Sequence, residues 1–369
     1  MDINNIILWI ISFGVVLGGL DYILKNKFKI GKEFEEGFMA LGPLALVVVG
    51  IVSLAPVIAR VLGPVIAPIL RLIGADPSVL ASILALDMGG YPLAMELAKT
   101  ETSGLFSGLI VASMLGATLV FSIPVALKII KEKDKIFFIK GLLAGLITIP
   151  IGAFIGGIIA GFPFQEVLLN TIPVLIISII LVLFLKFLPN KILRFAAIFG
   201  RFMIIIITIG LVAAVFEALT GIVVIPGMAP VSDGLKIVGL IGIVLLGAFP
   251  IVRLITRFLR KPLEKFGNLL SIGANDVAGL LASLANNIPM FHLMKKMSDR
   301  GKIINCAFMV SGAFILGDHL GFIAGVNRNM IFAVIVAKLI AAALAIPVAM
   351  IIAKKTERIT KLEKVSKQS

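Results

Sequence analysis

The sequence has 369 residues, of which 60% are apolar and 15% are charged, and its mean hydropathy is +1.14. A soluble globular protein is close to half apolar and about a quarter charged, so this composition argues against a soluble fold. The net charge of +14 does not indicate nucleic-acid binding, because the Lys and Arg residues follow the positive-inside pattern of membrane proteins. Without the alternation typical of outer-membrane barrels, the sequence predicts an all-α, polytopic integral membrane protein.

Several classes of function are excluded by missing motifs. The chain has one cysteine, Cys306, and two histidines, His292 and His319, so neither a disulfide framework nor a metal-binding spacing is present. No phosphate-binding GxxxxGK[ST] loop occurs, and no nucleophile–base pair stands out. We therefore expect no enzymatic activity, no cofactor and no bound metal.

Nine apolar runs are long enough to cross a membrane. Two further stretches, 61–77 and 253–265, combine prolines with basic residues, and we interpret them as lying at the membrane interface. The last residues, 354–369, form a basic tail. The expected spans cover about 6–24, 38–59, 104–130, 136–162, 167–185, 202–219, 235–254, 303–325 and 330–353.

Two apolar segments, 78–98 and 276–297, are interrupted in the middle by the helix-breaking sequences DMGGYP and NNIP. They align along their length, with Tyr91 falling on Phe291. Broken segments at corresponding places in two halves of a chain are typical of transporter binding sites.

Loop charge indicates that both broken segments are re-entrant hairpins. The basic stretches fall on one side of the membrane only if neither segment crosses it. An arm of about nine residues is roughly 14 Å long, which reaches the middle of a core ~30 Å thick. The sequence thus predicts about nine full spans plus two hairpins, or 11 spans if the hairpins cross.

The same argument predicts an inverted 5+5 repeat. The first hairpin enters from outside and the second from inside, because the spans preceding them run in opposite directions. The first repeat covers 1–162, a linker span covers 163–190, and the second repeat covers 191–353. This topology places the N-terminus outside and the C-terminus, with the tail 354–369, in the cytoplasm.

Polar and aromatic residues at the two breaks are the candidate substrate-binding residues. A carboxylate or an aromatic face suits an ammonium group, and amides suit a hydroxyl. Capping of the hairpin arms and ordinary packing are alternative roles for the same side chains. The candidates are Asp87, Gly89, Gly90, Tyr91, Asn286, Asn287 and Phe291.

Asp318 and His319 lie within the expected span 303–325. Ionisable residues inside a span are expensive to bury and are usually functional, so we interpret this pair as a gate or a proton site. The alternative is a structural role, in which the pair forms a hydrogen bond that holds two helices together. Asp21 and Glu217 lie nearer the ends of their spans, where contact with solvent accounts for them.

The chain resembles the bacterial ethanolamine utilisation permease family, EutH, over about residues 1–353. The resemblance is carried by LASILALDMGGYPLA (80–94), LANNIPMFHLMKKM (284–297), GKIINCAFMVSGAF (301–314) and LGDHLGF (316–322). It implies a multi-pass transporter of ethanolamine in the cytoplasmic membrane of a bacterium. The expected partners are ethanolamine and membrane lipids, not nucleic acid, and formation of a homo-oligomer stays open.

We expect facilitated diffusion of the protonated amine, driven by the membrane potential. Three alternatives remain: a proton- or sodium-coupled transporter of another small amine or polar metabolite, a transporter of a nucleoside-like solute, and a non-transporting membrane component.

Overall fold

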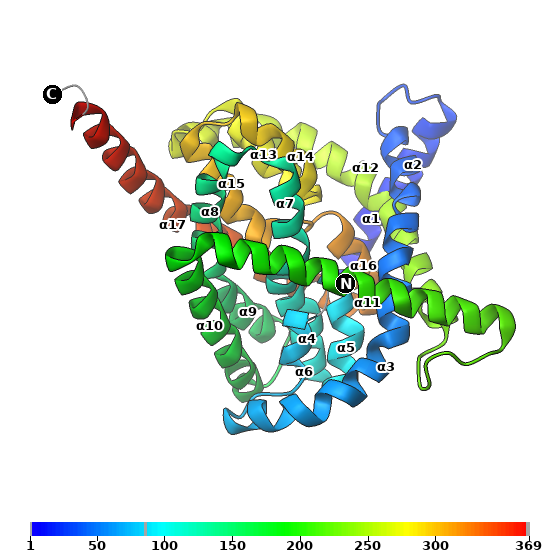
Figure 1. The fold of residues 1–369 in the computed structure, drawn as a ribbon. Coiled ribbons are helices and arrows are strands. Elements are labelled where there is room, and N and C mark those ends of the chain that lie inside the picture. Colours follow the sequence, from blue (N-terminus) through cyan, green and yellow to red (C-terminus); the bar gives the residue numbers. More distant parts are fainter. Residues whose placement is uncertain (1, 85–86, 367–369) are drawn as a thin grey trace.

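The computed structural model describes residues 2–84 and 87–366, and this part of the chain is helical without strands (Figure 1). Within it, eight helices are long and apolar enough to cross a membrane. The elements of the N-terminal half are α1 (Ile3–Ile23), α2 (Gly31–Met39), α3 (Leu41–Leu72), α4 (Val79–Leu84), η1 (Asp87–Gly89), α5 (Gly90–Leu97), α6 (Glu101–Leu105), η2 (Phe106–Ser122), α7 (Ile123–Ile129), η3 (Glu132–Asp134), α8 (Lys135–Leu146), α9 (Ile149–Ile159) and α10 (Phe164–Phe187).

The C-terminal half begins with two long helices and ends with a third, of 36 residues, which runs on through most of the basic tail. Its elements are α11 (Pro189–Thr220), α12 (Val231–Leu270), α13 (Ala274–Ala285), α14 (Asn287–Leu293), η4 (Met294–Lys296), α15 (Asp299–Gly312), α16 (Asp318–Val326), η5 (Arg328–Met330) and α17 (Ile331–Ser366).

The proline-rich stretch 61–77 is largely the end of α3, not a separate segment. Pro56, Pro64 and Pro68 lie inside this helix, where each removes a main-chain hydrogen bond and favours a bend. Figure 1 shows α3 descending and then turning along the lower edge of the bundle. The expected interfacial stretch 253–265 is likewise part of a continuous helix, α12, which contains Pro250 and Pro262.

Both broken segments fold back on themselves, and an aspartate closes the base of each. Asp76 precedes α4 and accepts a hydrogen bond from the main-chain N–H of Lys99, at 3.0 Å, beyond the end of α5. Asp276 in the first turn of α13 accepts one from the N–H of Ser298, also at 3.0 Å, beyond η4. Two residues more than 20 positions apart are thus joined at each base, so each segment is a helical hairpin.

The two hairpins lie toward opposite ends of the bundle. In Figure 1, α13 and α14 are at the top, whereas α4 and α5 are in the lower half. The first hairpin packs against η2, and the second packs against α12 and α15.

The expected uninterrupted span 303–325 is wrong, because the helix is broken between α15 and α16. Phe314 adopts a left-handed conformation with φ 62°, and residues 313–317 form turns. The main-chain N–H groups of Phe314 and Leu316 bond instead to the carbonyl oxygens of Ser283, at 3.0 Å, and Leu284, at 2.9 Å, near the end of α13. Contacts with the second hairpin therefore replace the missing helical bonds.

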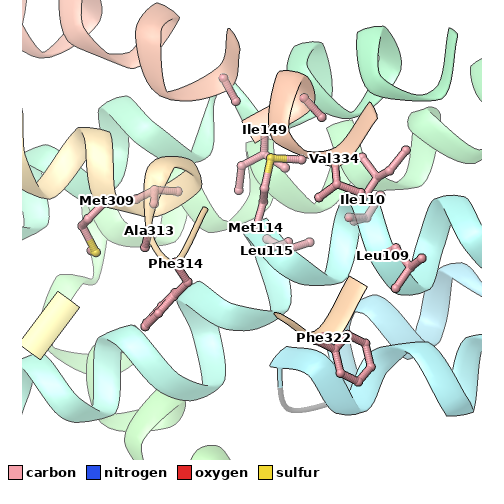
Figure 2. Packing of buried hydrophobic residues seen from close by; sticks show 14 of the residues in the cluster. Leu109, Ile110, Met114, Leu115, Ile149, Met309, Ala313, Phe314, Phe322 and Val334 are labelled. Atoms are coloured by element: carbon pink, nitrogen blue, oxygen red, sulfur yellow. The ribbon is translucent and has the colours of Figure 1, made fainter. Parts of the chain in front are cut away.

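The core is centred on η2, whose 17 residues are wound in wide π-type turns. Figure 2 shows Leu109, Ile110, Met114 and Leu115 of this element among the packed apolar side chains of the core. Small residues such as Gly108 allow other helices to approach it closely. Helices with π-type turns are rare and often occur at functional sites.

Candidate functional site

A small internal cavity lies where η1, η2 and α16 meet. Its volume of about 10 Å³ is close to that of a single water probe, and its lining includes Met88, Ser113, His319 and Phe322. Each of these elements departs from a regular long helix: η1 is a single 3₁₀ turn, η2 has π-type turns, and α16 begins directly after the break. Such irregular backbone is tolerated in a membrane where it is buried in protein or lines a cavity.

Lys338 of α17 places its ammonium group beside this cavity. The residue is 1% exposed. Its Nζ donates a hydrogen bond to the carbonyl oxygen of Ser113 and lies 3.0 Å from Nδ1 of His319. A charged ammonium group has only donors, so with Lys338 charged, Nδ1 of His319 is the acceptor and the proton of the neutral ring is on Nε2. Lys338, His319 and η2 thus form one polar cluster within the apolar core.

His319 is held in place by the break before α16. It lies in the first turn of that helix, next to Asp318, and its ring packs against Phe314 with a centroid distance of 4.9 Å. Phe314 is part of the segment that bonds to the second hairpin. The unwound residues 313–317 therefore connect the second hairpin with the cavity beside the first.

Tyr91 is a candidate residue of the first break that contacts the lining of this cavity. Its ring contacts the cavity-lining Phe322 edge to face, with centroids 6.0 Å apart. The approach of α5 to η2 depends on Gly108, where a Cβ would lie 2.7 Å from Cα of Tyr91. Gly89 and Gly90 are buried at the start of α5, and the side chain of Asp87 lies outside the described residues.

The candidate residues of the second break do not line this cavity. The side chain of Asn286 caps α14 by accepting from the N–H of Ile288, at 2.9 Å. Asn287 is 0% exposed and donates to Oγ of Ser122, at 2.8 Å. Phe291 packs edge to face on Phe138, with centroids 6.1 Å apart. In this conformation these three side chains therefore make capping, hydrogen-bonding and packing contacts, which are the alternative roles to substrate binding.

Asn286 lines a separate and larger cavity, of about 550 Å³, between α2, α12 and the second hairpin. Glu33 and Arg253 also line it and form an ion pair, with 3.7 Å between Oε1 and Nε. The cavity brings carboxylate and amide groups together beside the second break.

Lys338 was missed by the sequence analysis, although a signal was present. It is the one lysine in the apolar run IFAVIVAKLIAAALAIP (331–347), and a charged residue within a span is a functional candidate. Its partners include Ser113, 225 positions away in the chain, so only the folded structure shows what it contacts.

The fold and this cluster define the class of the protein. It is a multi-pass helical membrane protein, with two hairpins and a buried cation beside interrupted helices. In the described part of the chain, no group of three or more His, Cys, Asp or Glu side chains is placed to hold a metal ion.

Comparison with known proteins gives the family. The family model "Ethanolamine utilisation protein, EutH" matches residues 3–352, so the chain belongs to this family. It is 49% identical to "Probable ethanolamine permease EutH" of Listeria monocytogenes serotype 1/2a (strain 10403S), covering 96% of this chain and 95% of the relative. It is 46% identical to the protein of the same name from Escherichia coli (strain K12), covering 97% of both chains. No solved structure matches. The relatives are named as permeases, and the family is one of transporters, not enzymes.

Proposed function

We propose that this protein carries ethanolamine across the cytoplasmic membrane as the protonated amine. The observation that carries the proposal is the family match over residues 3–352, together with relatives that are named as ethanolamine permeases. The substrate is a primary ammonium with a hydroxyl two carbons away. Both groups need hydrogen-bond partners in a site shielded from water.

The route that we propose runs between the two hairpins. The inverted 5+5 repeat, 1–162 and 191–353, would place one hairpin at each membrane face. The N-terminus would lie outside and the C-terminus in the cytoplasm. The hydrogen bonds that Asp76 and Asp276 accept at the hairpin bases and the opposite positions of the hairpins in Figure 1 support this arrangement.

Substrate recognition would use residues of the two breaks, with the cluster around His319 as a gate. The ring of Tyr91 already contacts the cavity-lining residue Phe322. Asn286 and Asn287 would need to exchange their present contacts for the substrate, which is expected if transport opens the second hairpin. The proposed binding residues are Asp87, Gly89, Gly90, Tyr91, Asn286, Asn287 and Phe291, and the proposed gating or proton residues are Asp318 and His319.

We further propose that the membrane potential drives uptake without an obligatory co-transported ion. A single charge gains about 2.3 kcal/mol per 100 mV. At ~1.4 kcal/mol per decade, this supports accumulation of roughly fifty-fold. The hydrogen-bonded pair of Lys338 and His319 is the specific observation that favours proton coupling as the second candidate mechanism.

The test uses purified protein in liposomes with a potassium-set potential and labelled ethanolamine. With no sodium or pH gradient, uptake should increase as the interior becomes negative. Liposomes without protein are the control. A requirement for a sodium or proton gradient would refute uncoupled movement, and absence of ethanolamine uptake under every gradient would refute the proposed substrate.

A further inference from the structure

The head group of Lys338 has the same chemistry as the head group of the proposed substrate. Both are primary ammonium groups attached to a methylene carbon. The Lys338 ammonium donates to the Ser113 carbonyl oxygen and lies at hydrogen-bond distance, 3.0 Å, from Nδ1 of His319. A main-chain carbonyl and a neutral imidazole are both acceptors for such a group. Together they form a position that fits an ammonium group.

This position lies next to the cavity and is filled. Ser113 and His319 are lining residues, and the free volume beside them, about 10 Å³, has room for about one water. A molecule with four heavy atoms such as ethanolamine therefore cannot enter unless something moves. Lys338 is wholly buried, and its flexible side chain is the cationic group that occupies the space.

We propose that Ser113 and His319 form an ammonium subsite that Lys338 fills in the absence of substrate. Ethanolamine takes the subsite by displacing the lysine head group. Two ammonium groups cannot share these acceptors, because like charges at such a distance repel strongly away from water. The Lys338 ammonium thus competes with the substrate ammonium for the same two acceptors. The inference rests on the proposed function and deepens it by naming the amine subsite.

The subsite also accounts for the irregular backbone of the two elements that form it. The Ser113 carbonyl belongs to η2, whose π-type turns change the spacing of main-chain groups relative to an α-helix. His319 is presented by the first turn of α16, which begins where it does because the chain is unwound at residues 313–317. Both departures from regular helix bring an acceptor to the same ammonium group.

A purely structural lock between α17, η2 and α16 is the competing explanation, and binding measurements separate the two. The variants are Lys338→Met, which keeps the length of the side chain without its charge, and Lys338→Arg, which keeps the charge. The matched control is Lys302→Met, since Lys302 is also largely buried but pairs with Asp134 at 2.9 Å, away from the cavity. Ethanolamine binding to each purified protein in lipid nanodiscs is measured by calorimetry.

If the subsite is free for about a tenth of the time in the wild-type protein, removal of the tethered cation tightens binding about ten-fold. We expect Lys338→Met to show this gain and Lys338→Arg to bind more weakly than the wild type, because its planar head group donates to several acceptors at once. Lys302→Met should bind like the wild type.

A folded Lys338→Met protein with unchanged or weaker binding would overturn the inference. If that variant does not fold, Lys338→Arg decides, and unchanged binding would then overturn it. Uptake by wild-type liposomes tests the proposed function separately, so failure of transport and failure of the subsite are distinguishable.

Discussion

Removal of the Asp276 carboxylate should open the base of the second hairpin. This side chain is 1% exposed. It accepts hydrogen bonds from the N–H of Gly273 at 2.8 Å, the N–H of Ser298 at 3.0 Å and the hydroxyl of Ser298 at 2.7 Å. In Asp276→Ala the hydroxyl can turn to another acceptor, whereas the two main-chain donors stay in place without a partner.

Each main-chain donor left unpaired costs about 1–3 kcal/mol, and because both are partly buried we expect a total loss of roughly 2–4 kcal/mol. Thermal unfolding of the purified protein in detergent measures this loss as a lower midpoint. The matched control is Asp299→Ala. The Asp299 side chain is 66% exposed and pairs with Lys302 at 3.1 Å. Because Lys302 keeps its second partner, Asp134 at 2.9 Å, loss of the solvent-exposed carboxylate should cost only about 0–1 kcal/mol. If Asp276→Ala unfolds at the wild-type temperature, the aspartate does not close the hairpin energetically and the reasoning is wrong.

Two further predictions concern topology and substrate binding. In a Cys306→Ala background, single cysteines at the exposed positions Glu101 and Lys296 should react with an impermeant thiol reagent from outside and from the cytoplasm respectively. Labelling of both from the same side would contradict the inverted repeat. Asp87→Asn should weaken ethanolamine binding by about 1–3 kcal/mol, the range for a lost charge-assisted hydrogen bond, as measured by calorimetry. Wild-type affinity in a correctly inserted variant would exclude Asp87 as a further ligand of the substrate ammonium group.

The elements that could be predicted from the sequence are those with a local signal. Long apolar runs predict nine spans, close to the eight described helices that are long and apolar enough to cross a membrane. The breaks DMGGYP and NNIP indicate both hairpins, because each combines a proline, which removes a main-chain hydrogen bond, with glycines or asparagines, which disfavour a helix interior. The aspartates at the hairpin bases are also visible as the similar sequences IGAD (73–76) and IGAN (272–275), although the clamping residue of the second hairpin is Asp276, one position later.

What could not be predicted depends on contacts between distant residues. The stretch FILGDHLGF (314–322) contains no proline, yet its first four residues are unwound, and carbonyl groups of the second hairpin accept hydrogen bonds from the N–H groups of two of them. The substrate candidates at the two breaks were expected to act together. In the structure Tyr91 lies near the cavity, whereas Asn287 and Phe291 are engaged in packing elsewhere. Lys338 joins the cluster with His319 and η2 through contacts that the pattern of apolar residues in the sequence does not show.

The unwound residues 313–317 have a mechanical consequence. At one side they are bonded to the second hairpin so closely that a Cβ on Gly317 would overlap the carbonyl oxygen of Ala285. At the other side they lead directly into His319, beside the first hairpin. We therefore expect a displacement of the second hairpin to move these five residues, and with them His319 beside the first hairpin. We expect this connection to prevent both hairpins from opening at the same time. The protein would then not leak ions between transport cycles in a membrane that holds a potential.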